Sequence, residues 1–233
     1  MMKDTILKKI PNYLFFIFSY LVLSKFLVLI FLLLNQSSKY NTGIMVFGTA
    51  VSLFGLKVFI YFWKKLALGK EFGEHDSSLK KKGIGILVAF VALISASFLL
   101  YLMNPISIGE NETLSKIIDT NKHMFVFYLF RTILIVPIYE EVLFRGVILG
   151  LEKKYLNTLT LDSKKKSAAL AGCILLNSII FAYLHHANSI VTFFVFLFFG
   201  VISSCLVLYT KDLKCSILLH QLNNLFSILS SLG

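Results

Sequence analysis

Charged residues are scarce in this 233-residue chain. Asp, Glu, Lys and Arg make up 15% of it, whereas a soluble domain carries about 25%. Apolar residues make up 57% of the chain, and they are gathered in long runs that hold almost no charge. These two features exclude an ordinary soluble domain. They predict an all-α fold, a polytopic integral membrane helical bundle with about seven transmembrane helices.

Cysteine and arginine are also rare. The three cysteines (Cys173, Cys205 and Cys215) have no CxxC spacing and lie in or near apolar runs, which is typical of small buried residues. The net charge of +11 comes almost wholly from lysines that gather between the apolar runs. Lysine in the loops is what membrane topology requires, so the positive charge does not indicate a nucleic-acid partner.

Seven apolar runs are each long enough to cross a hydrocarbon core of about 30 Å as a helix. The first run has no small-residue cleavage site and contains Lys25, so we interpret it as a retained span. The alternation of lysine-rich segments predicts a multi-pass protein of the cell membrane with a cytoplasmic N-terminus, although six or eight spans also fit. The runs cover residues 13–34, 43–63, 84–103, 123–150, 167–187, 189–209 and 214–232.

A lysine-rich segment at residues 64–82 is the main linker. It divides the chain into an N-terminal transmembrane helix pair with its basic linker, residues 1–80, and a core, residues 81–233. The loop at 104–122 carries several isoleucines among polar residues. It is equally well explained by a short interfacial helix and by an ordered polar loop.

Glu140 and Glu141 are the only acidic residues inside an apolar run. A carboxylate in a bilayer is expensive and usually persists for a function, and two adjacent ones cannot both ionise cheaply without partners. Arg145 follows Glu141 at i+4, so the two can form an ion pair on one helix face. Pro137 cannot donate to the carbonyl of Ile133, and a kink there would open space beside the carboxylates.

Two later runs carry polar residues at helical spacing. Phe181 and His185 lie one turn apart, as do His220 and Asn224. Taken singly, these residues could be interfacial or could form hydrogen bonds between helices. Taken with Glu140, they form a set that could activate water, because a carboxylate can act as general base while His and Asn donate to a developing oxyanion. No activated serine or cysteine and no HExxH motif is present.

Three motifs in order, EExxxR, FxxxH and HxxxN, resemble those of the CPBP family of CAAX proteases and bacteriocin-processing (Abi) enzymes, which includes the type II CAAX prenyl endopeptidases. The resemblance covers about residues 120–230 and implies an intramembrane endopeptidase. In bacteria it further implies bacteriocin processing, self-immunity or scaffolding. By position, Glu140 would activate the water with the help of His185, His220 and Asn224 would form the oxyanion site, and Glu141 and Arg145 would support the site structurally.

The resemblance fits a glutamate protease without an obligatory metal. The alternative is a zinc site formed by Glu140, His185 and His220 with one open position. The expected partners are a membrane protein or peptide substrate and the lipid bilayer. Two other classes remain: a non-catalytic interaction or immunity protein on the same fold, and an ion-coupled transporter. The transporter is the weaker of these, because the sequence shows no internal repeat and no Gly-rich unwound span.

Straight spans would place the two histidines at different depths. His220 lies about 9 Å from the start of its run and His185 about 27 Å from the start of its own. We therefore expect the fourth helix to continue to about Leu156 and the fifth to begin near Ser163–Lys166. We also expect the turn at 210–214 to lie inside the membrane, which is permitted where backbone lines a cavity.

Overall fold

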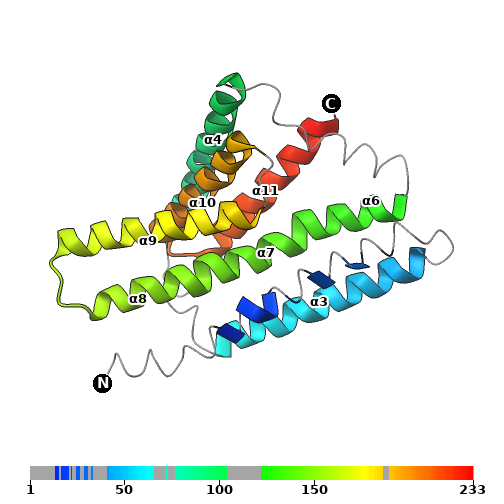
Figure 1. The fold of residues 1–233 in the computed structure, drawn as a ribbon, viewed down its shortest axis with the longest axis horizontal. Helices are drawn as coiled ribbons and strands as arrows, with labels where there is room; N and C mark the ends of the chain where they lie inside the picture. Colours follow the sequence, from blue (N-terminus) through cyan, green and yellow to red (C-terminus); the bar gives the residue numbers. More distant parts are fainter. Residues whose placement is uncertain are drawn as a thin grey trace.

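A computed structural model describes residues 14–15, 17–20, 22, 25–26, 29–30, 33, 41–65, 72, 77–103, 122–185 and 189–232. Apart from short turns these residues are helical, and the described part contains no strand (Figure 1). The all-α prediction is therefore confirmed. In each of the seven predicted apolar runs, the residues that the structure describes are helical apart from those at the turns. The proposed interfacial helix at 104–122 and most of the linker lie outside the described residues.

After the helical residues described between 14 and 33, the chain forms α3 (Asn41–Lys65) and α4 (Leu79–Met103), which precede the central helix. The fourth run is one unbroken helical stretch with two π-helical parts: α6 (Lys122–Leu129), η2 (Phe130–Ile135), α7 (Val136–Glu141), η3 (Val142–Leu149) and α8 (Gly150–Thr158). It is followed by α9 (Ser163–Leu184), α10 (Ile190–Thr210) and α11 (Leu213–Leu232). Within the described part, 4 helices (α3, α4, α9 and α10) are long and apolar enough to cross a membrane.

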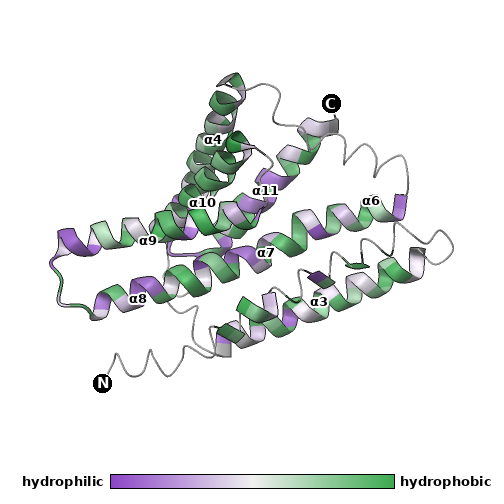
Figure 2. Ribbon diagram, viewed as in Figure 1, coloured by the Kyte–Doolittle hydropathy of each residue, from purple (hydrophilic) through white to green (hydrophobic). Residues whose placement is uncertain are grey.

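The helices form two groups, which are joined where α10 packs against α9 and where α11 packs against α7. In one group α3 lies along α6 and α8 lies along α9; in the other, α4, α10 and α11 pack together (Figure 1). Helix α11 contacts α7 and η2, and α10 packs against both α9 and α4. Figure 2 shows α4 and α10 hydrophobic along most of their length, with hydrophilic residues where α7 and α11 meet. An apolar exterior around a polar interior is the arrangement a bilayer favours.

Helix α8 ends and α9 begins close to the residues predicted from the membrane depths of His185 and His220. Helix α8 continues to Thr158 and α9 begins at Ser163, close to the expected Leu156 and Ser163–Lys166. The stretch from Lys122 to Thr158 is roughly 50 Å long, which exceeds the hydrocarbon core. Asp162 caps α9 by accepting from the Lys165 backbone N–H at 2.8 Å. Hydrogen bonds from Lys165 lower the pKa of Asp162, so the cap is ionised at neutral pH.

The turn between α10 and α11 is fixed by contacts to the start of α4. Lys211 adopts a left-handed conformation with φ 56°, and its N–H donates to the Val207 carbonyl. Asp212 forms an ion pair with Lys82 at 2.8 Å. The hydroxyl of Ser77 donates to the Thr210 carbonyl at 2.7 Å. These contacts set where α11 begins, and therefore where His220 lies relative to α7.

Candidate active site

The glutamate pair closes α7, a short α-helical segment between the two π-helical ones. At its start the Val136 N–H donates to the Arg131 carbonyl, which is five residues back. In this register the donor for the Thr132 carbonyl would be residue 137, and Pro137 has no N–H. The side-chain amide of Asn224 donates to that carbonyl instead, at 2.9 Å. Proline therefore frees the carbonyl of Thr132 rather than that of Ile133, because the helix is π-helical at this point.

The contact with Thr132 also fixes the place of Asn224. Its amide donates to the backbone of η2, and no hydrogen bond joins it to Glu140, His185 or His220 among the described residues. The structure thus brings Asn224 to the helix that carries the glutamates but not to the carboxylates themselves. In this arrangement Asn224 stabilises the wide helical turn that precedes Glu140.

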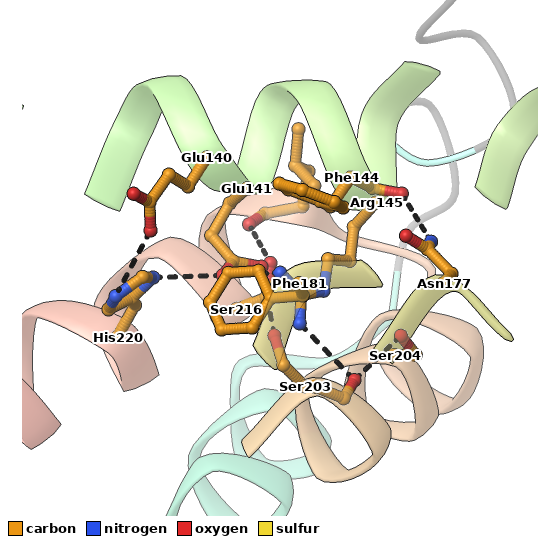
Figure 3. A network of polar contacts seen from close by, with 12 residues as sticks. Glu140, Glu141, Phe144, Arg145, Asn177, Phe181, Ser203, Ser204, Ser216 and His220 are labelled. Carbon is orange, nitrogen blue, oxygen red and sulfur yellow. Dashed lines mark hydrogen bonds and ion pairs between the residues drawn. The ribbon is translucent and has the colours of Figure 1, made fainter. Parts of the chain in front are cut away.

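Glu141 lies at the centre of a polar network joining three helices (Figure 3). Its side chain is fully buried, with 0% of the residue exposed. Its Oε1 accepts from Arg145 Nη1 at 3.1 Å and lies 2.9 Å from His220 Nδ1. Its Oε2 accepts from the Ser203 hydroxyl at 2.8 Å. The ion pair expected from the i, i+4 spacing is formed, and Glu141 connects it to α10 and α11.

Arg145 completes this network on the side of α10. Its Nη2 donates to the Gly200 carbonyl at 3.2 Å, and its guanidinium lies over the Phe181 ring, 4.7 Å from the centroid. Gly200 is required here, since a Cβ at this position would lie 2.7 Å from the Ser178 Cβ. Small residues allow helix backbones in membranes to approach closely. The close packing of α9 and α10 is what brings the carbonyl within reach of Arg145.

Glu140 has a different environment from its neighbour. Its Oε1 accepts from the Tyr20 hydroxyl at 3.1 Å. Its Oε2 lies 3.5 Å from His185 Nε2 and 3.7 Å from His220 Nε2, yet it has no hydrogen-bond donor and is buried. One oxygen of Glu140 is thus anchored, and the other faces two imidazoles from α9 and α11.

The hydrogen bonds of the two histidines define which ring nitrogens carry protons. His185 Nδ1 lies 2.7 Å from the Phe181 carbonyl, and His220 Nδ1 lies against the Glu141 carboxylate. Both partners accept only, so both Nδ1 atoms must donate. In the neutral imidazoles the Nε2 atoms are then acceptors, and together with Glu140 Oε2 they form a group of three acceptors. A water molecule, or a proton on a histidine, supplies the donor that this group needs.

Aromatic rings enclose the histidines. His185 stacks on Phe196 with the ring centroids 4.2 Å apart, and His220 lies 4.5 Å from Phe199. Phe181 lies 4.2 Å from His185. Apolar walls lower the local dielectric and strengthen the polar contacts inside them. The two α10 phenylalanines were not among the predicted site residues, because their only signal in the sequence is the aromatic content of the 189–209 run.

No group of three or more His, Cys, Asp or Glu side chains in the described part of the chain could hold a metal ion. Hydrolysis without a metal stays a prediction, which chelation would test.

The structure brings together five of the six residues that the sequence singled out: Glu140, Glu141, Arg145, His185 and His220. They come from three spans and occupy one site. Two further contributors were not anticipated, namely Tyr20 and Ser203. Each is a hydroxyl residue inside an apolar run, and neither belongs to a motif, so nothing in the sequence indicates the contact.

Comparison with protein families agrees with this geometry. Residues 122–226 match the family described as type II CAAX prenyl endopeptidase Rce1-like. The chain carries an Rce1-like domain. The matched range begins at α6, ends within α11 and contains all three motifs, which confirms the resemblance. Neither the curated proteins nor the solved structures contain a match. The match to this family supports an intramembrane CAAX-type endopeptidase activity.

Proposed function

We propose that the Rce1-like domain cleaves a peptide bond inside the membrane with water activated by Glu140. The observation that carries this proposal is the buried Oε2 of Glu140, which faces the Nε2 atoms of His185 and His220 and has no donor of its own. With a proton on His220 Nε2, a water molecule held between the two remaining acceptors, Glu140 Oε2 and His185 Nε2, would have its hydrogens directed at a base. Its oxygen would be free to attack a carbonyl carbon.

In the proposed reaction Glu140 Oε2 takes a proton from water while the water oxygen bonds to the scissile carbonyl carbon. The carbonyl π electrons move onto its oxygen, where His220 in its protonated form stabilises the charge. Collapse of the intermediate breaks the C–N bond. Glu140 gives the proton that it took from water to His185 Nε2, His185 passes this proton to the leaving amine, and Glu140 returns to the carboxylate. The side chain of His185 is 21% exposed and that of His220 6%, so His185 is the better placed to meet a leaving group.

The remaining polar residues would position these groups. Glu141 binds the Nδ1 of His220, Arg145 neutralises Glu141, and Ser203 holds its second oxygen. Asn224 would support the site through its hydrogen bond to the Thr132 carbonyl in η2. The resemblance assigns it to the oxyanion site with His220, a role that would require its amide to leave Thr132.

A prenylated CAAX peptide with an internal quencher is the substrate that tests the proposal. The full chain, purified in detergent, is expected to cleave it, and Glu140→Gln is expected to lower the rate by about 10²- to 10⁴-fold. Glu152→Gln makes the same change in α8, on the same continuous helix, and should cleave like the wild type. Equal cleavage by wild type and Glu140→Gln would reject the proposed mechanism.

The biological output is a separate part of the proposal. We propose processing of a bacteriocin precursor or another membrane peptide, with non-catalytic immunity as the competing output. Expression of Glu140→Ala in cells separates the two. Accumulation of one membrane precursor would support processing, whereas full cellular function at normal expression would rule it out.

A further inference from the structure

Glu140 has only one hydrogen-bond donor among the described residues, and it comes from outside the Rce1-like domain. That donor is the Tyr20 hydroxyl, 3.1 Å from Oε1. Glu141, by contrast, is held by Arg145, His220 and Ser203. A buried glutamate with one fixed contact depends on it for its orientation.

We propose that Tyr20 is a positioning residue for hydrolysis, whose phenol anchors Oε1 of Glu140 and thereby directs Oε2 at the two histidines. The inference rests on the proposed function of Glu140. A hydrogen bond to an ionised carboxylate is shorter and stronger than one between neutral groups, and it acts here in a buried setting. The two oxygens of Glu140 then have separate tasks: one is held by the first span, and the other meets the water.

The charged and titratable groups around Glu140 do not duplicate this contact. His185 and His220 face Oε2, and Arg145 is committed to Glu141 and the Gly200 carbonyl. Arg131 interacts electrostatically with both Glu140 and Tyr20, but no hydrogen bond joins its guanidinium to either of them. Within the described part of the chain, the anchor of Oε1 therefore comes from Tyr20 alone.

The contact extends the site across the division drawn from the sequence. Tyr20 belongs to residues 1–80, and the family match begins only at residue 122. The N-terminal span would therefore contribute to catalysis, in addition to crossing the membrane. An Rce1-like domain without the N-terminal span would keep its three motifs but lose the hydrogen bond that anchors Glu140, its proposed general base.

The chain offers a matched control. Tyr139 precedes Glu140 directly and is more deeply buried than Tyr20, with 3% of the residue exposed. Its hydroxyl points to the Ser52 carbonyl of α3 at 3.5 Å, and its ring packs on Phe59 at 4.9 Å. Tyr139→Phe therefore removes one buried hydroxyl next to the site without touching Oε1 of Glu140.

The test compares Tyr20→Phe, Tyr139→Phe and wild type on the quenched prenylated CAAX peptide. Tyr20→Phe is expected to lower kcat by about ten- to a hundredfold with KM little changed, and Tyr139→Phe to stay near wild type. Wild-type kcat in Tyr20→Phe, with Glu140→Gln inactive, would overturn the inference and leave the proposed function standing.

A stability cycle tests the contact independently of activity. Tyr20→Phe, Glu140→Ala and the double variant are made in the full chain, and the loss in Tm of each is measured in detergent. Losses that are not additive support the anchoring contact. Additive losses overturn it, whether or not the peptide is cleaved. If wild type leaves the peptide intact while the cycle shows coupling, the proposed function fails and the anchor stands.

Discussion

Glu141 and Arg145 form a buried ion pair, and breaking it from one side should destabilise the fold severely. Both residues are almost fully buried, at 0% and 1% exposed. In Arg145→Met the side chain keeps its bulk but the carboxylate of Glu141 loses its cation. Loss of one partner of a buried pair costs about 3–5 kcal/mol. The contact of the guanidinium with the Phe181 ring, at 4.7 Å, adds about 1–2 kcal/mol.

Replacing both partners separates the energetics of the pair from its role in the site. In the double variant Glu141→Leu with Arg145→Met, no charge is left without a partner, so stability should recover in part. Activity should not recover, because His220 Nδ1 has lost its acceptor and Ser203 its carboxylate. Stability and cleavage activity then respond differently to replacement of the same two residues.

Unfolding in mixed detergent micelles, followed by helix content, measures the free energy of unfolding for wild type, both single variants and the double variant. Cleavage of the quenched peptide is measured on the same preparations. The reasoning would be refuted if Arg145→Met cost less than about 1 kcal/mol, which is the range of an exposed pair. It would also be refuted if the double variant regained wild-type cleavage.

Three further predictions concern the helix packing, the π-helical turn before Glu140 and the metal. Gly200→Ala should lower the Tm, because its Cβ would lie 2.7 Å from the Ser178 Cβ; adding Ser178→Gly should restore most of the loss, and no restoration would contradict the packing argument. Asn224→Ala should cost about 1–3 kcal/mol of stability by leaving the Thr132 carbonyl without a donor. It should lower kcat less than Glu140→Gln does, and an equal loss would instead favour a direct catalytic role. Incubation with 1,10-phenanthroline should leave peptide cleavage unchanged, whereas inhibition reversed by zinc would establish a metal enzyme.

Composition and spacing were sufficient to predict the membrane bundle and most of the site. Apolar runs of span length can satisfy their backbone in lipid only as helices, so the fold class follows from where the charges are absent. The Glu141–Arg145 pair follows from i, i+4 spacing, which is a local property of a helix. The bounds of α8 and α9 also followed, since two histidines of one site must reach the same depth.

The backbone hydrogen-bond pattern of the central helix could not be predicted from the sequence. The sequence shows Pro137, and an ordinary α-helix would then leave the carbonyl of Ile133 without a donor. The structure instead has a π-helical turn at this point. The carbonyl left without a backbone donor is therefore that of Thr132, and the side-chain amide of Asn224 donates to it. A π-helical turn depends on what packs beside it, and α11 supplies the compensating amide.

The amino-acid sequence is enough to identify a helical membrane protein, the residues that are expensive to keep in a bilayer, and those among them that share a helix face. The packing of the helices brings Tyr20 to Glu140, Ser203 to Glu141 and His220 between the two glutamates. These contacts join residues far apart in the chain, and a single hydroxyl in an apolar run has no periodicity to mark it. Helical periodicity is a property of neighbours in sequence, whereas the partner of a buried polar group is chosen by how the helices pack.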